Sequence, residues 1–304
     1  MKKVLLSLLV VLLGLFITDR VGGMAMRWVN RHTEDMLAPK FRYICEQVCE
    51  DVVMIGASRC HHHYVPSIIA DSIGMSVYNC GIRGSENIYS HYMTLCLILQ
   101  RHKPKVVCLE LMGLDVIRQR APFAKLAYYA PYFGYSDRAD SVFRLGGSYW
   151  KYRLSHLYRY NAKAMSNIAG LFVNRQENED QGYVPAPNAS VRLDKLNRNE
   201  VSPEADPQKM LYLKRFTDLC RSEGCHVVFT ISPFYYEVTP KFYAILRDFA
   251  QKENIPLLDY HTPGLFHDHP ELFRDAKHLN DQGARAFSAI FAEDLKGELD
   301  TMRN

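Results

Sequence analysis

Short runs of Val, Ile and Leu alternate with helix-like stretches along most of the chain, and this alternation constrains the fold more than any other feature. Five runs have the length and composition of buried strands: 51–56, 75–79, 105–111, 226–231 and 255–259. Continuous apolar runs of this kind are typical of parallel strands covered on both faces. Helix-like stretches accompany them at 61–73, 86–101, 207–223, 240–253 and 281–298. We therefore predict an α/β fold, a flavodoxin-like three-layer sandwich whose parallel sheet has about five strands.

The composition agrees with a folded body and excludes several classes of protein. Apolar types make up 48% of the 304 residues and charged types 23%, which argues against disordered, collagen-like and multi-span membrane chains. The net charge is only +4, and no run of Lys and Arg is longer than two residues. A nucleic-acid partner is therefore not expected. Nothing in the chain predicts a cofactor.

The amino end has the pattern of an export segment. Lys2 and Lys3 precede an uncharged apolar run over 4–17, which Asp19 and Arg20 follow. At about 1.5 Å per residue this run spans roughly 21 Å, less than the hydrocarbon core of about 30 Å. It is similar to the charged and apolar regions of a secretory signal, without a clear cleavage site. Residues 1–25 are thus a signal peptide or an uncleaved signal anchor, and a buried core helix is a further alternative.

The strand–helix alternation is interrupted at about 116–205. This stretch carries many of the 19 Tyr and 15 Phe residues, and its polar part from 174 to 207 predicts a solvent-exposed end. Long non-repetitive connections of this kind are often functional lids. The alternative is a helical subdomain that packs its own aromatic side chains.

Two short motifs carry side chains suited to chemistry. Ser58 follows Gly56 just beyond the first predicted strand, where open α/β sheets expose ligand-facing residues. A serine at such a junction is most often only a helix N-cap. Asp275 lies three residues before His278, so its carboxylate can hold one imidazole nitrogen while the other acts as a base. Together the three residues make a candidate Ser-His-Asp triad.

Four segments in this order resemble the conserved blocks of the SGNH/GDSL hydrolase superfamily: 56–59 (GASR), 79–84 (NCGIRG), 110–115 (ELMGLD) and 275–278 (DAKH). The resemblance covers about 50–115 and 207–298. It implies one SGNH-like α/β domain over 26–304, interrupted at about 116–205.

The resemblance also implies roles for individual residues. Ser58 becomes the nucleophile, His278 the general base and Asp275 its orienting group. The backbone N–H groups of Ser58 and Gly84 become the oxyanion hole, with Asn79 as a further donor. Five other residues are expected to line the cleft: Arg59, Arg83, Asn87, Ser232 and Phe234.

One position departs from the pattern, because Leu114 stands where the family has a donor Asn. Loss of one oxyanion donor costs about 2.7–4 kcal/mol of transition-state stabilisation. Three side chains could replace it: Asn79, Arg83 and Asn87. The resemblance therefore leaves two hypotheses: a serine esterase or O-acyltransferase that acts on acyl or acetyl esters of a cell-envelope glycan or lipid, or a weak or inactive SGNH-like domain that binds glycan or partners a membrane acyltransferase. Either protein is expected outside the cytoplasm, anchored in the inner membrane by residues 4–17 or secreted after cleavage.

Histidines and cysteines suggest metal or disulfide chemistry but do not have the required spacing. Adjacent helical residues such as His61, His62 and His63 point about 100° apart, so we predict no metal site, although one of the three imidazoles is expected beside Ser58. The eight cysteines lie mostly in apolar segments and are expected as buried free thiols.

Overall fold

The computed structural model describes residues 1–35, 37–173, 180–186, 204–235, 241–261, 265–266 and 268–303. Its centre is a five-stranded sheet in the order β2-β1-β3-β4-β5, with every neighbouring pair parallel. The strands are β1 (Val52–Ile55), β2 (Val77–Asn79), β3 (Val106–Glu110), β4 (His226–Ile231) and β5 (Leu257–Asp259). This order and direction confirm the predicted flavodoxin-like sheet.

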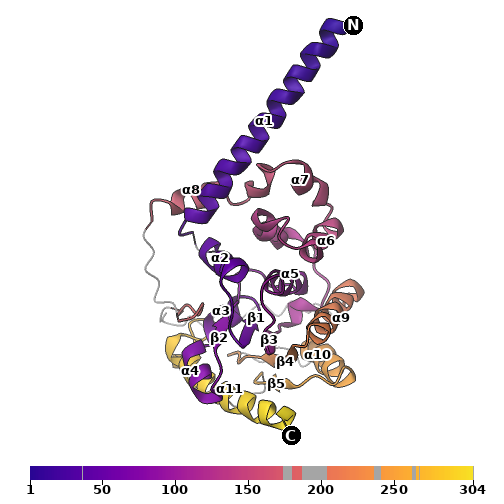
Figure 1. Ribbon diagram of the computed structural model, residues 1–304. Coiled ribbons are helices and arrows are strands. Elements are labelled where there is room, and N and C mark those ends of the chain that lie inside the picture. Colours follow the sequence, from indigo (N-terminus) through magenta and orange to yellow (C-terminus); the bar gives the residue numbers. More distant parts are fainter. Residues whose placement is uncertain are drawn as a thin grey trace.

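Helices cover both faces of the sheet, which makes three layers (Figure 1). Side chains of β1 alternate between two apolar cores, with Val53 and Ile55 on one face and Val52 and Met54 on the other. The first core is closed by α2 (Ala38–Glu46), α5 (Ile88–Ile98), α9 (Pro207–Ser222) and α10 (Lys241–Lys252). The second is closed by α4 (Pro66–Ile73) and α11 (Asp281–Arg303).

Two helix predictions were wrong in detail. The single helix expected over 61–73 is divided into α3 (Ser58–His63) and α4, with Tyr64 and Val65 extended between them. Pro66 is the cause, because a proline disfavours helical geometry in the residue before it. Helix α2 was not predicted from the sequence at all.

The region between β3 and β4 folds into short helices beside α1 and α5 (Figure 1). They are η1 (Gly113–Asp115), η2 (Ala124–Tyr132), α6 (Asp137–Leu145), α7 (Tyr149–Leu154), η3 (Tyr158–Tyr160) and α8 (Ala164–Gly170). Tyr129, Tyr132 and Phe143 are buried in the first core, where Phe41 of α2 contacts the two tyrosines.

The expectation of a solvent-exposed end at 175–205 fails for residues 180–186, whereas Glu204 is exposed. The Gln181 carbonyl accepts the Asn79 N–H at 2.9 Å, which adds residues 180–186 to the edge of the sheet at β2. Tyr183 and Ala186 are buried. The rest of that prediction, residues 175–179 and 187–203, lies outside the described residues.

The amino-terminal helix α1 (Lys2–His32) extends well beyond the apolar run from which it was predicted. Its most apolar 18-residue window has a mean hydropathy of 2.3 and no buried side chains, so α1 is long and apolar enough to cross a membrane. Its carboxyl-terminal half packs on the body, where Gly23 and Asn30 are buried. The helix continues beyond Ile17 because packing on the body stabilises its carboxyl-terminal half. The apolar pattern of the sequence does not show this packing.

Candidate active site

Ser58 is the first residue of α3. It lies two residues after Gly56, where the chain turns sharply as it leaves β1. Gly56 is required in this turn, since a Cβ atom there would lie 2.6 Å from the Cβ of Cys60 and 3.0 Å from that of Glu110. The N-cap of α3 is Ala57, so the alternative that Ser58 is an N-cap does not hold. Its hydroxyl instead lies 2.8 Å from Nε2 of His278.

His278 is held by a small hairpin before α11. The Arg274 N–H donates to the His278 carbonyl at 2.8 Å, and Phe273 and Leu279 form an antiparallel bridge. Nε2 of His63 accepts the Leu279 N–H at 3.0 Å, which ties the hairpin to α3. The side chain of Asn280 caps α11 by accepting the Gly283 N–H at 2.9 Å. The base is therefore positioned by backbone contacts on both sides.

Asp275 completes the triad geometry. Its two carboxylate oxygens lie 2.9 and 3.0 Å from Nδ1 of His278, and it also accepts the N–H groups of Lys277 and His278. Burial alone would raise the pKa of Asp275, but these hydrogen bonds outweigh it and lower the pKa to about 2. The carboxylate is therefore ionised at neutral pH and holds the Nδ1–H tautomer, which leaves Nε2 to accept the Ser58 proton.

A turn opposite α3 brings a second backbone amide to the site. The Ser85 N–H donates to the Ile82 carbonyl at 3.2 Å, and Gly84 has a φ of 79°. A positive φ at this position of a turn favours glycine. Ser58 N–H, at the first helical position, belongs to the amides that a helix leaves without an internal acceptor.

The cleft at this place has a volume of about 250 Å³ and a polar lining. The residues are Ser58, His62, Arg83, Gly84, Glu86, Arg274, Asp275 and His278. Among the predicted residues, the structure therefore brings together the triad, Gly84 and Arg83.

Sequence reasoning missed three of the lining residues, namely His62, Glu86 and Arg274. Arg274 directly precedes Asp275, and this proximity is the signal that could have found it. For His62, the sequence indicated only that one imidazole of the three lies beside Ser58. The Nδ1–H of His62 donates to the Val184 carbonyl at 2.7 Å, and burial lowers its pKa to about 4. A neutral ring that can accept through Nε2 thus stands next to the triad.

The other two imidazoles of α3 bind in different directions. Nδ1 of His61 accepts from the buried Lys40 ammonium at 2.6 Å, and Nδ1–H of His63 donates to Ser232 Oγ at 2.8 Å. Among the described residues, no three His, Cys, Asp or Glu side chains are grouped so that they could hold a metal ion. All eight cysteines are free, and seven of them are buried.

Two asparagines expected at the site are used elsewhere. The amide group of Asn79 donates to the carbonyls of Cys60 and Tyr64 at 2.6 and 2.9 Å, so it has no donor left for an oxyanion. Asn87 caps α5 by accepting the Tyr89 N–H at 3.1 Å, and its amide donates to the Pro122 carbonyl. Both predictions fail because the amides satisfy buried backbone groups.

Arg59, Ser232 and Phe234 are not among the described residues that line the cleft. Arg59 is fully buried, pairs with Glu110 and has its guanidinium 3.8 Å from the centre of the Phe234 ring. Ser232 hydrogen-bonds to His63 and Glu110. These three residues therefore interact with one another and with Glu110 at the carboxyl ends of β3 and β4. Leu114 packs against the first core, so its side chain supplies no donor either.

Comparison of the sequence with protein-family models and with curated proteins finds no match. Comparison with solved structures finds several matches, among them two bacterial proteins. One, assigned to the G-D-S-L family of lipolytic proteins, is from Desulfitobacterium hafniense (12% identity, TM-score 0.40, 80% of this chain and 97% of that one). The other, assigned as an acylhydrolase, is from Bacteroides fragilis (12% identity, TM-score 0.43, 87% of this chain and 97% of that one). These likenesses concern the fold.

Proposed function

We propose that the protein is a serine ester hydrolase of the SGNH type that forms an acyl-enzyme on Ser58. The observation that carries this proposal is the unbroken chain of contacts from Ser58 Oγ through His278 to Asp275. Each of its hydrogen bonds is between 2.8 and 3.0 Å long. This is the arrangement that activates a serine hydroxyl.

The residues suggest the following course of reaction. Nε2 of His278 accepts the Ser58 proton as Oγ attacks the ester carbonyl, and Asp275 stabilises the imidazolium. The backbone N–H groups of Ser58 and Gly84 bind the oxyanion. His278 then protonates the leaving alcohol. Water, or the hydroxyl of an acceptor molecule, releases the acyl group by the same steps in reverse, so the cleft serves hydrolysis or acyl transfer.

The lining of the cleft favours a polar substrate. Every described lining residue except Gly84 has a polar or charged side chain, and two of them are the arginines Arg83 and Arg274. A long acyl chain finds no apolar channel among these side chains. We therefore propose a short acyl ester, such as an acetyl group on an envelope glycan. Arg83 is the side chain best placed to replace the donor that Leu114 lacks.

Membrane attachment through α1 is part of the same proposal. Lys2 and Lys3 before the apolar run are typical of an export signal, which favours an extracytoplasmic body. Asp19 accepts the N–H groups of His156 and Leu157 at 2.9 and 3.2 Å. Cleavage near residue 25 would remove these contacts, so we propose an uncleaved anchor.

Hydrolysis of p-nitrophenyl acetate tests the enzymatic claim. Ser58→Ala and His278→Ala are each expected to reduce kcat/KM by at least about 10³-fold, because each removes a group that acts in every step. Ser141→Ala, on α6 away from the cleft, is the matched control and should retain full activity. The octanoate ester should react more slowly than the acetate. Wild-type activity that survives Ser58→Ala unchanged would contradict the proposal.

The alternative is a binding domain without turnover, and Leu114 is the observation that favours it. The two hypotheses differ in the outcome of one comparison. A binding domain would keep the folded triad and bind acetylated glycan, yet wild type and Ser58→Ala would show the same background hydrolysis.

A further inference from the structure

The joint between α1 and the body is rigid, and this fixes which surface meets the membrane. Asp19 accepts hydrogen bonds from Ser155 Oγ and from two backbone N–H groups of the loop after α7. The Arg20 guanidinium donates to the Leu154 carbonyl at 3.1 Å. At Gly23 a Cβ atom would lie 2.5 Å from the Cβ of His156, so the two backbones are in close contact. The helix cannot pivot freely on such a joint.

The uncharged apolar run covers only part of a bilayer, so the residues of α1 that follow it must complete the span. The run over 4–17 spans about 21 Å, against a hydrocarbon core of roughly 30 Å. If the hydrocarbon core of the bilayer begins at Val4, it extends along α1 to about Gly23. At this residue the loop after α7 packs on the helix. A stretch that is too short is accommodated by local thinning of the bilayer, by snorkelling of flanking side chains or by apolar surface packed beside the helix.

Apolar side chains are exposed at this level on α7, and further along α1, beside Asn30 and Thr33, on α8. On α7, Trp150 and Leu154 are each 68% exposed and lie four residues apart on one face of the helix. On α8 and directly after it, Met165 is 80% and Phe172 84% exposed. The buried face of α8, with Asn167 and Gly170, packs against the end of α1 instead. We call the four exposed side chains the α7–α8 surface.

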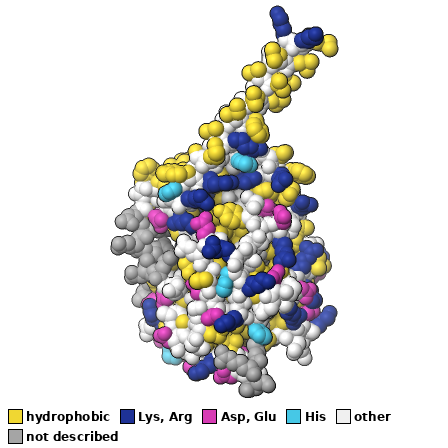
Figure 2. Space-filling view, viewed as in Figure 1, with side chains coloured by type: hydrophobic (Ala, Val, Ile, Leu, Met, Phe, Trp, Pro, Cys, Tyr) yellow, Lys and Arg dark blue, Asp and Glu magenta, His cyan; other side chains and the backbone are white. Residues whose placement is uncertain are grey.

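Hydrophobic side chains appear on both sides of the base of α1, where the helix leaves the body (Figure 2). Helices α7 and α8 flank this base (Figure 1). The exposed groups of α7 and α8 thus belong to helices on both sides of the place where α1 leaves the body.

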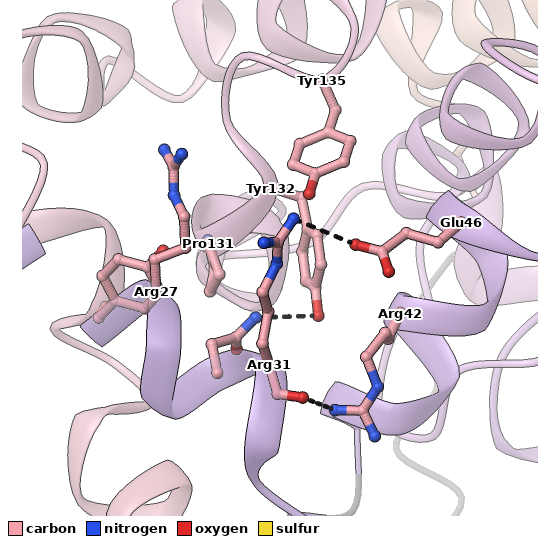
Figure 3. A pocket seen from close by; sticks show the side chains of 9 residues that line it. Arg27, Arg31, Arg42, Glu46, Pro131, Tyr132 and Tyr135 are labelled. Atoms are coloured by element: carbon pink, nitrogen blue, oxygen red, sulfur yellow. Dashed lines mark hydrogen bonds and ion pairs between the residues drawn. The ribbon is translucent and has the colours of Figure 1, made fainter. Parts of the chain in front are cut away.

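Basic groups outnumber acidic ones around this surface, where the carboxylates of Asp19 and Asp35 are ion-paired with Arg20 and Lys163. Residues 141–173 contain five Lys and Arg residues and no Asp or Glu. Arg27 and Arg31, one and two turns beyond Gly23, line a small pocket with Arg42 and only one carboxylate, that of Glu46 (Figure 3). The Arg31 guanidinium lies 3.7 Å from Glu46, and the side chain of Arg31 is 58% exposed. Basic groups at headgroup depth are attracted by anionic phospholipids.

We propose that the α7–α8 surface lies in the interface of a bilayer that contains anionic phospholipid, beside the membrane-spanning α1. The inference rests on the proposed anchoring by α1. It assigns the region between β3 and β4 a second function besides packing the core: the region holds the body flat against the membrane, with Trp150 at the level of the acyl chains and Arg27 and Arg31 among the phosphates.

Tryptophan fluorescence tests this placement, because the chain has only two tryptophans. The substitution Trp28→Phe leaves Trp150 as the only tryptophan. The full chain with this substitution is reconstituted in phosphatidylcholine vesicles with brominated acyl chains. The vesicles are prepared with and without phosphatidylglycerol. We expect a blue-shifted emission and several-fold quenching of Trp150 by the bromine atoms, stronger when phosphatidylglycerol is present. Trp150 itself is the probe, so the α7–α8 surface carries no substitution in this experiment.

A chain with Trp28→Phe, Trp150→Phe and Leu211→Trp is the matched control. Leu211 of α9 is also exposed, at 44%, but lies away from α1, so its replacement should remain unquenched. Vesicles that retain the protein on flotation while Trp150 is unquenched would overturn the inference and leave the anchoring intact. That outcome would indicate a protein partner for this surface. A chain that does not float with the vesicles would overturn the anchoring and the inference together, and hydrolysis of p-nitrophenyl acetate would be unaffected.

Discussion

At the scale of single residues, the site depends on one carboxylate that is half exposed. Asp275 has 48% of its side chain exposed, whereas His278 has 22%. Solvent weakens the interaction between such a carboxylate and an imidazolium. The hydrogen bonds from Lys277 and His278 compensate, because they fix the carboxylate in place and keep it ionised. Orientation of His278 is therefore the principal contribution that we assign to Asp275.

Asp275→Asn tests this assignment. The substitution keeps the size of the side chain but removes the charge and can present an N–H group to Nδ1, which favours the wrong tautomer of His278. We expect kcat/KM to fall on the order of 10²–10³-fold, less than for a fully buried orienting carboxylate. KM should change little. Steady-state kinetics measures the effect, and a loss below about threefold would show that Asp275 does not orient the base.

At the scale of elements, the turn at 82–85 and helix α3 face each other across the cleft. The turn depends on Gly84, whose positive φ an alanine would adopt only at a cost of about 1–2 kcal/mol. Space is not the obstacle, since an added Cβ would meet only Tyr128, at 3.9 Å. Any loss of activity would therefore arise from the position of the Gly84 N–H.

Gly84→Ala and Gly74→Ala form a matched pair for this purpose. Gly74 ends α4 with a φ of 68° and has no atom within 4 Å of an added Cβ. Both substitutions should lower the free energy of unfolding by about 1–2 kcal/mol. Only Gly84→Ala should also lower kcat, by about tenfold or more, because it shifts an oxyanion donor. Equal activities in the two variants would contradict the role of Gly84.

The same elements show where the sequence was informative. The strands were predicted well because Val, Ile and Leu runs are local signals, and Ser58 and Asp275-x-x-His278 lie at ends of predicted elements. Helix α2 was missed because Lys40 lies on its buried face and hides the apolar pattern. There the ammonium donates to Nδ1 of His61 and to two carbonyls, those of Gly81 and Gly182. These partners are distant in sequence.

Long-range contacts also explain the wrong site residues. The sequence shows that Asn79 and Asn87 follow strand ends, but it does not show which carbonyls their amides bind. The aromatic side chains of the region between β3 and β4 were expected to belong to a lid or to a helical subdomain that packs them together. Many of these side chains contact one another, as Phe133 does with Phe143 and Tyr149, and others contact α2 and α5, because the short helices there must bury their apolar faces.

At the scale of the whole molecule, stability is expected to depend on the three adjacent imidazoles of α3. Burial lowers the pKa of His62 to about 4, and it also lowers the pKa values of His61 and His63 well below the usual 6.5. In the unfolded chain all three titrate near 6.5. Below that pH the unfolded state binds protons that the native state does not. The stabilisation is complete above pH 6.5 and is lost as the pH falls toward 4.

Urea unfolding of the detergent-solubilised chain measures this dependence. Below pH 6.5 and down to about pH 5, the slope of the free energy of unfolding should approach about 1.4 kcal/mol per pH unit for each imidazole. His62→Gln should reduce this slope by about 1.4 kcal/mol per pH unit, which is the contribution of one proton. His226→Gln, which removes an exposed imidazole of β4, should leave the slope unchanged. A wild-type slope near zero in this range would contradict the buried neutral state of these side chains.

Labelling with a fluorophosphonate probe tests the central claim most directly, because it reports the nucleophilicity of Ser58 without knowledge of the substrate. Intact mass and peptide mapping should show one adduct per chain, located on Ser58, in wild type and in Ser141→Ala. The adduct should be absent from Ser58→Ala, and it should form much more slowly in His278→Ala. A folded wild-type chain that takes up no probe, or takes it up at another residue, would contradict the proposed triad.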